Sequence, residues 1–102
     1  MKGWIYILEC SDKSYYVGST NNLERRIKEH QSGQGSLYTS KRLPIKLLFS
    51  FECENIVVAF NLEHQIKKWS RSKKEALIRG EYNLLVELSK KKFRKSIKDS
   101  FI

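Results

Sequence analysis

Two side chains that could act together on a phosphate lie on one face of a predicted helix that begins after Asn22. On a helical wheel, Leu23, Ile27 and His30 fall within about 60° of one another, and Arg26 lies at the edge of the same face. Arg26 and His30 are four residues apart, so their side chains are neighbours. An arginine can hold a phosphate through forked hydrogen bonds, and a histidine can accept or relay a proton. We therefore interpret this helix as part of a site.

A carboxylate is predicted on the apolar face of a second helix, which extends from Ile56 to about Trp69 after the cap residue Asn55. The apolar stripe of this helix comprises Ala59, Leu62, Ile66 and Trp69. Glu63 lies within about 60° of the centre of that stripe, whereas His64 points away from it. A carboxylate in this position pairs with a cation, lies at the rim of the core or binds a metal ion. The residues alone leave these alternatives open.

Two tyrosines are predicted on a β-hairpin that precedes the helix carrying Arg26. Residues 3–8 have strand composition, residues 11–14 have turn composition, and residues 15–18 are predicted to return antiparallel. If the connecting loop has odd length, Tyr6 and Tyr16 fall on the same face of the sheet. Taken alone, each tyrosine is explained by ordinary strand packing with its hydroxyl at the rim.

A long connection, residues 31–43, contains two glycines, several hydroxyl groups, one aromatic residue and a Lys-Arg pair. Long loops in compact domains are often functional, and hydroxyl and cationic donors suit a phosphate backbone. The candidate nucleic-acid contacts here are Tyr38, Thr39, Lys41 and Arg42, with Tyr38 available to stack on a base. The alternative is a solvated basic loop without a binding role.

The remaining segments complete an α/β (α+β) pattern. Pro44 precedes a third predicted strand at residues 45–51. Short helices are predicted at residues 70–79, where Gly80 ends the helix, and at residues 81–88. We expect one domain over residues 1–89, followed by a basic C-terminal tail at residues 90–102 that either extends the last helix or frays.

Composition restricts the class of protein. The chain has 102 residues, of which 40% are hydrophobic, which is enough for one modest core. Its net charge of +9 favours polyanionic partners, nucleic acid first and an anionic membrane second, although solubility alone also accounts for such a charge. We expect no membrane-spanning segment. Cys10 and Cys53 are expected as buried small hydrophobic residues in a reducing, cytoplasmic environment rather than as a disulfide.

The arrangement of these motifs resembles the GIY-YIG nuclease family. The segments Trp4-Ile5-Tyr6 and Tyr16-Val17-Gly18 precede a helix with Arg26 and His30, and Glu63 follows on a later helix. The resemblance covers residues 2 to about 88 and is closest to small stand-alone members and to the GIY-YIG nuclease domain of the excinuclease. Trp4 replaces the first Gly of the motif and Val17 replaces its second Ile, and both keep strand character.

The resemblance implies a small three-stranded antiparallel or mixed sheet flanked by helices, with a phosphodiesterase site on the face of the sheet. The catalytic positions that it implies are Tyr6, Tyr16, Arg26, His30 and Glu63. Glu63 would be the ligand of one Mg²⁺ (or Mn²⁺) ion. Lys67 and Arg71 belong to a segment that resembles the stand-alone members, and we expect them to contact nucleic acid. Tyr6 is favoured over Tyr16 as the general base, and Asn83 is available as a late asparagine near the metal, without a secure alignment.

The leading hypothesis is a metal-dependent endonuclease that acts on structured or damaged DNA, as in repair or recombination. DNA is the expected partner, with RNA not distinguished, and a partner protein could supply specificity. The alternatives are a non-catalytic nucleic-acid-binding module, a nuclease subunit that depends on a partner, and a structural adaptor. The adaptor hypothesis is the weakest, because it leaves Arg26, His30 and Glu63 on apolar stripes without explanation.

Overall fold

The computed structural model describes residues 2–86 of the chain. The elements are, in order, β1 (Gly3–Glu9), β2 (Tyr15–Thr20), α1 (Leu23–Gln31), α2 (Leu37–Ser40), β3 (Lys46–Cys53), α3 (Ile56–Lys67) and α4 (Arg71–Ile78). The predicted α+β fold with a three-stranded sheet is confirmed. Residues 83–86 are helical, but the rest of the helix predicted at 81–88, the domain end at residue 89 and the basic tail lie outside the described residues.

The sheet has the strand order β2-β1-β3, and both strand pairs are antiparallel. Because side chains alternate along a strand, Ile5 and Ile7 point to one face and Tyr6 points to the other. Tyr6 pairs with Gly18, so Tyr16, two residues earlier on β2, lies on the same face as Tyr6. The sequence-based expectation for the two tyrosines is correct, and β2 is an edge strand.

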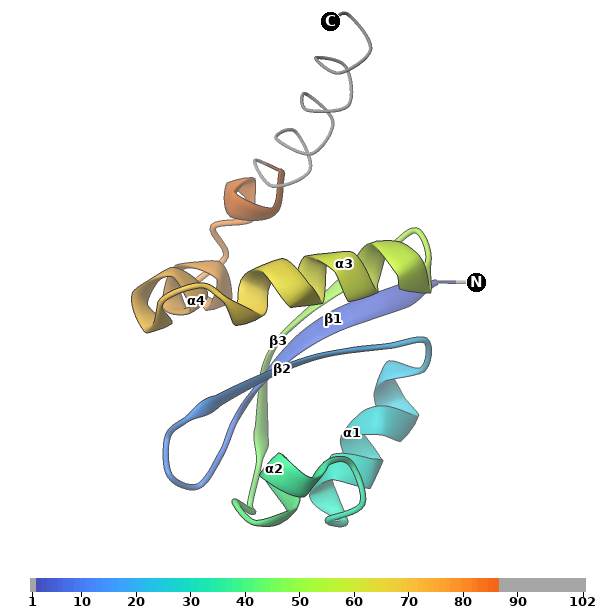
Figure 1. Ribbon diagram of the computed structural model, residues 1–102, viewed down its shortest axis with the longest axis vertical. Helices are drawn as coiled ribbons and strands as arrows, with labels where there is room; N and C mark the ends of the chain where they lie inside the picture. Colours follow the sequence, from blue (N-terminus) through green and yellow to red (C-terminus); the bar gives the residue numbers. More distant parts are fainter. Residues whose placement is uncertain (1, 87–102) are drawn as a thin grey trace, which may run out of the picture.

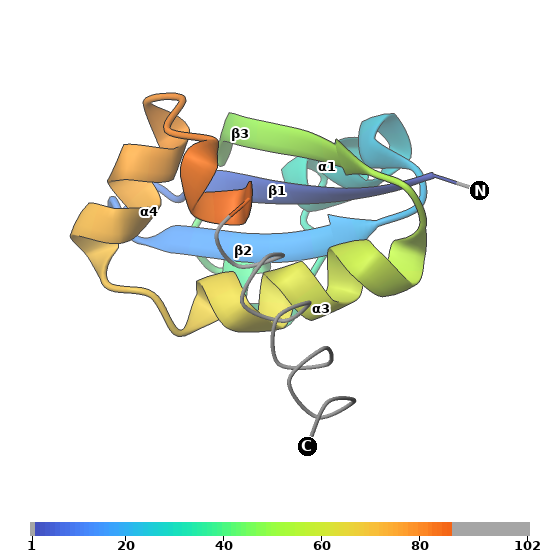
Figure 2. The same ribbon diagram turned by 90° about the horizontal axis from the view of Figure 1, so that it is seen from above.

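Helices cover both faces of the sheet. α3 and α4 lie on one face, and α1 and α2 lie on the other, as Figure 1 shows from the side and Figure 2 from above. The core under α3 and α4 contains Ile5, Ile7, Val17, Phe49, Ala59, Ile66 and Leu77. The second core contains Tyr6, Leu8, Cys10 and Ile45, with Tyr16, Leu23 and Ile27 packed against it. Burial on both faces explains why β1 is apolar along most of its length.

Polar side chains cap the helices at their first turns. Asn22, Asn55 and Ser70 each accept a hydrogen bond from a backbone N–H three residues later, as expected for N-cap residues. Ser36 caps α2 in the same way. α2 lies inside the connection at residues 31–43, which we predicted as a loop. A four-residue helix is too short to produce a hydrophobic period, so its sequence carries only the cap.

Both cysteines lie within the described residues. Cys10 and Cys53 are both buried and free. Between residues 2 and 86, the helices are too short and too polar to cross a bilayer.

Candidate active site at the edge of the sheet

Tyr6 reaches across β2 because its cross-strand partner, Gly18, has no side chain. A Cβ atom at Gly18 would overlap the Cζ and Oη atoms of Tyr6. The tip of the phenol ring therefore lies over the backbone of the edge strand. Tyr6 is 1% exposed, so its hydroxyl must find partners inside the protein.

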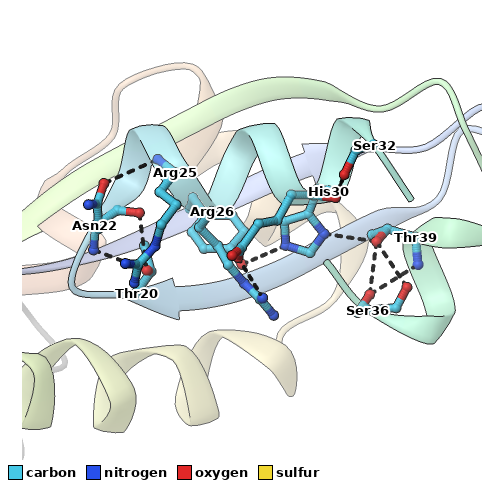
Figure 3. Close-up of polar contacts among 10 residues, drawn as sticks. Thr20, Asn22, Arg25, Arg26, His30, Ser32, Ser36 and Thr39 are labelled. Carbon is cyan, nitrogen blue, oxygen red and sulfur yellow. Dashed lines mark hydrogen bonds and ion pairs between the residues drawn. The ribbon is translucent and has the colours of Figure 1, made fainter. Parts of the chain in front are cut away.

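The Tyr6 hydroxyl begins a chain of hydrogen bonds through the second core. Its oxygen lies 2.8 Å from Nε2 of His30, and Nδ1 of His30 lies 2.8 Å from Oγ1 of Thr39. Oγ1 of Thr39 in turn lies 2.9 Å from Oγ of Ser36. Figure 3 shows the His30 ring reaching from α1 to Thr39 and Ser36. Both ring nitrogens are thus satisfied in a fully buried imidazole.

The connection at residues 31–43 serves to hold His30. A Cβ atom at Gly35 would overlap Cγ and Nδ1 of the His30 ring, so only glycine allows this close approach. Thr39 is fully buried against the same ring. Thr39 was a candidate nucleic-acid contact, but its burial does not support a direct contact, and its observed partner gives it a positioning role instead.

Arg26 places a permanent positive charge near the Tyr6 hydroxyl, where it acts to lower the pKa of the phenol. Its Nη1 donates a hydrogen bond to Oε1 of Glu29 at 3.1 Å. Burial acts to lower the pKa of Arg26, but its interactions with Tyr6 and Glu29 raise it above its ordinary value. The side chain is 31% exposed. A permanently charged group with this exposure can bind an incoming phosphate.

Tyr16 lies in a group of rings beside His30. Its ring centroid is 5.2 Å from that of His30 and 6.5 Å from that of Tyr6, and Tyr38 stacks on it at 6.0 Å. The guanidinium of Arg42 lies 3.8 Å from the centroid of the Tyr38 ring. Tyr38 is therefore already stacked on Tyr16 and contacted by Arg42, and a nucleic-acid base could stack on it only if one of these neighbours moved.

The other candidate nucleic-acid contacts also have observed environments. Arg42 pairs with Asp12 at 3.1 Å, and Arg71 lies 4.0 Å from the centroid of the Tyr15 ring while donating to the backbone oxygen of Lys13. Lys41 is exposed. Arg42 and Arg71 thus hold the β1–β2 hairpin against α2 and α4, and their role toward nucleic acid remains a proposal.

Glu63 approaches the site from the opposite face of the sheet. Its side chain is 8% exposed, Oε1 accepts a hydrogen bond from Oγ of Ser19 at 2.5 Å, and Oε2 lies 2.7 Å from Nζ of Lys67. Ser19 directly follows Gly18 on β2, so it faces α3 while Gly18 lies under Tyr6. The charge of Glu63 contributes to raising the pKa of Tyr6. The carboxylate and the phenol therefore contact neighbouring residues of β2, Ser19 and Gly18, from opposite faces of the sheet.

This geometry corrects the expectation of a site on one face of the sheet. Tyr6, Tyr16, Arg26 and His30 belong to the face covered by α1, whereas Glu63 belongs to the face covered by α3. Both groups contact β2, an edge strand, where Tyr6 lies over Gly18 and Glu63 binds Ser19. Figure 2 shows α3 running along the β2 side of the sheet.

The protonation states follow from burial. Burial raises the pKa of Tyr6 to about 12, although Arg26 acts to lower it. Burial, followed by the positive charge of Arg26, lowers the pKa of His30 to about 4. At pH 7 Tyr6 therefore keeps its proton and His30 is neutral, so the 2.8 Å contact joins a phenol to an uncharged imidazole.

The depressed pKa of His30 predicts a pH-dependent stability. In the unfolded chain a histidine titrates near 6.5, so between pH 6.5 and about 4 the unfolded state binds more protons than the folded state. The free energy of unfolding should therefore fall by about 2 to 3 kcal/mol as the pH drops through this window. His30→Gln should remove this contribution in urea titrations at several pH values. An equal slope in the wild type and in His30→Gln would contradict the prediction.

Replacing Gly18 should displace Tyr6. A methyl group at this position overlaps the tip of the phenol ring, so Gly18→Ala should cost about 1 to 3 kcal/mol of stability and break the hydrogen bond to His30. A double-mutant cycle measured by urea unfolding checks the cause. In a Tyr6→Leu background, Gly18→Ala should cost less than half as much. The same cost in both backgrounds would mean that the clash lies elsewhere.

The residues around Glu63 fit a divalent cation. Its carboxylate already holds a cationic group, the ammonium of Lys67, and the hydroxyl of Ser19 adds a second oxygen. Within residues 2–86 there is no cluster of three or more His, Cys, Asp or Glu side chains. A single carboxylate suits Mg²⁺, which keeps several water ligands and shares the substrate phosphate.

The sequence interpretation missed several supporting residues. These are Gly18 as the platform for Tyr6, Ser19 as the partner of Glu63, Glu29 as the partner of Arg26, and Gly35 and Ser36 beneath His30. Strand alternation could have placed Ser19 opposite Gly18. A buried imidazole needs a partner for each nitrogen, which could have directed attention to the hydroxyl-rich segment after His30.

Comparison with known proteins agrees with this geometry. A profile of the GIY-YIG catalytic domain matches residues 2–76. A UPF0213 protein of Natronomonas pharaonis is 41% identical over 78 residues, covering 76% of this chain and 92% of that protein. The solution NMR structure of the UPF0213 protein BH0048 from Bacillus halodurans is 40% identical and covers 87% of this chain and 98% of that chain, with a TM-score of 0.51. The solution NMR structure of protein EF2693 from E. faecalis is 35% identical in sequence, with a TM-score of 0.54. The match covers 78% of this chain and 84% of that chain. The chain therefore belongs to the GIY-YIG family, a nuclease-type family, and groups with its small stand-alone UPF0213 proteins.

Proposed function

We propose that the protein is a metal-dependent endonuclease that hydrolyses phosphodiester bonds in structured or damaged DNA, with a role in repair or recombination in the cytoplasm. The observation that carries the proposal is the buried chain of hydrogen bonds from Tyr6 through His30 to Thr39, with the partly exposed positive charge of Arg26 nearby. Such a chain has little structural purpose in a small core, because burying polar groups is costly unless all are satisfied.

Tyr6 and His30 form the proposed proton path. The attacking water gives a proton to Oη of Tyr6 while Tyr6 gives its own proton to Nε2 of His30, which requires the tautomer with hydrogen on Nδ1. Thr39 favours this tautomer because its hydroxyl oxygen can accept from Nδ1. The tyrosine acts as general base without ionising in advance, which its raised pKa would prevent at pH 7.

Arg26 binds the phosphate in the proposed mechanism. Its positive charge is one cause of the low pKa of His30, so an anionic phosphate beside Arg26 would raise that pKa again. Substrate binding thereby prepares His30 to receive the proton. Tyr16 packs on the rings of Tyr6 and His30, and we assign it a role in positioning the phosphate or the water.

Glu63, supported by Ser19, would hold one Mg²⁺ or Mn²⁺ ion. When bound, such an ion supplies positive charge to the phosphoryl oxygens and to the leaving oxygen. Lys41, Arg42, Lys67 and Arg71 would contribute charge toward the phosphate backbone, in keeping with the net charge of +9. A partner protein could add specificity.

The direct test is cleavage of labelled flap, bubble, nicked and branched DNA by the purified protein. We expect cutting of at least one of these substrates with Mg²⁺ or Mn²⁺ and none with EDTA, and an RNA of matched shape tests the choice of nucleic acid. Salt-sensitive binding without cleavage in either metal would instead support a non-catalytic module or a nuclease that needs a partner. DNA binding that is no tighter than that of an unrelated protein of equal charge would contradict both of these alternatives.

A further inference from the structure

We infer that Lys67 occupies the cation position of Glu63 when substrate is absent and leaves it when a phosphate arrives, so that metal binding is coupled to nucleic-acid binding. This inference rests on the proposed function in two respects, namely that Glu63 is the metal ligand and that Arg26 binds the phosphate. It adds that Lys67, a residue of the same chain, regulates metal binding at Glu63.

Both oxygens of the Glu63 carboxylate are engaged in the structure. Oε2 lies 2.7 Å from the ammonium nitrogen of Lys67, and Oε1 accepts from Ser19. The Glu63 side chain is only 8% exposed, so the ammonium supplies the positive charge that a buried carboxylate requires. A divalent cation that binds this carboxylate must therefore displace Lys67 or share the carboxylate with it.

Sharing is unfavourable because two positive groups would lie within a few ångströms of each other in a largely buried setting. Lys67 is the partner that can move. Its side chain is 48% exposed, it is the last residue of α3, and its four-carbon stem is flexible. Ser19 is fixed on β2 and its neutral hydroxyl does not repel a cation.

A phosphate bound at Arg26 gives the displaced ammonium a new partner. Glu63 binds Ser19, the residue next to the Gly18 over which the Tyr6 ring lies, and the charges of Glu63 and Arg26 both affect the pKa of Tyr6. A phosphate at this point would attract Lys67 away from Glu63 and free the carboxylate. By linkage, nucleic acid should then tighten metal binding, and metal should tighten nucleic-acid binding by the same factor.

The experiment measures Mn²⁺ binding by electron paramagnetic resonance, which needs no turnover. Lys67→Met removes the ammonium and keeps the length of the side chain, and Lys67→Gln is a second neutral variant if the first is unstable. Lys68→Met is the matched control, since Lys68 is the next residue and is exposed. Without DNA, we expect both Lys67 variants to bind Mn²⁺ about 10-fold more tightly than wild type, and Lys68→Met to bind as wild type does.

A second measurement adds a branched DNA in a Tyr6→Phe background, which blocks turnover. DNA should tighten Mn²⁺ binding when Lys67 is present and should have about 10-fold less effect in Lys67→Met.

If Glu63→Gln abolishes Mn²⁺ binding but neither Lys67 variant binds it more tightly, the role of Lys67 is overturned and the proposed function stands. If Glu63→Gln leaves Mn²⁺ binding intact, the metal assignment in the proposed function fails instead. A loss of stability in Lys67→Met without tighter Mn²⁺ binding would reduce the contact to a structural ion pair.

Discussion

Glu63→Gln is expected to lower the rate of DNA cleavage by about 10³-fold or more while the protein stays folded. The amide keeps the shape of the side chain and an oxygen for the hydroxyl of Ser19. It loses the negative charge that pairs with Lys67 and that would hold a divalent ion. Since Lys67 is half-exposed, we expect a stability cost of about 1 kcal/mol or less.

Single-turnover cleavage, thermal unfolding and circular dichroism together separate a catalytic defect from a folding defect. Glu54→Gln is the matched control, because Glu54 is an exposed glutamate just before α3 and its replacement changes the net charge equally. The control should cleave at the wild-type rate. Wild-type cleavage by Glu63→Gln would remove the carboxylate from the mechanism.

The parts of the site that the sequence predicts correctly depend on local periodicity. A cap at Asn22 and an apolar period fix which face of α1 turns inward, so the proximity of Arg26 and His30 follows from spacing alone. The common face of Tyr6 and Tyr16 follows from strand alternation once the hairpin register is known.

The position of Glu63 could not be predicted in the same way. Helical periodicity shows only that its side chain points into the protein, and it does point inward. Which strand it meets depends on the order β2-β1-β3, a result of long-range pairing that leaves β2 at the edge. The carboxylate contacts that strand at Ser19, next to the glycine beneath Tyr6, and no local pattern contains this information.

The burial of Thr39 could not be predicted from the sequence, for a different reason. Composition describes the segment at residues 31–43 as polar and basic, which favours an exposed loop. The hydroxyl of Thr39 is nevertheless fully buried, because the imidazole of His30 needs a second partner once it is inside the core. A polar side chain can thus be required by a buried polar neighbour, and its residue type alone does not reveal this.

Arg26→Met should reduce cleavage by about 10³-fold, because it removes the positive charge that would bind the phosphate and balance the negative charge that develops on its oxygens. The neighbouring Arg25 provides the control. It is exposed on the same helix, and Figure 3 shows its side chain beside Thr20 and Asn22, away from His30. Arg25→Met makes the same change in net charge and should keep cleavage within a few-fold of wild type.

A second readout of Arg26→Met does not depend on activity. The positive charge of Arg26 is one cause of the depressed pKa of His30, so its removal should raise that pKa from about 4 toward, but not to, its ordinary value, because burial remains. NMR titration of the His30 ring in the wild type, Arg26→Met and Arg25→Met measures this shift. If both arginine variants lose cleavage equally and neither shifts His30, the effect is that of general surface charge, and Arg26 has no particular place in the site.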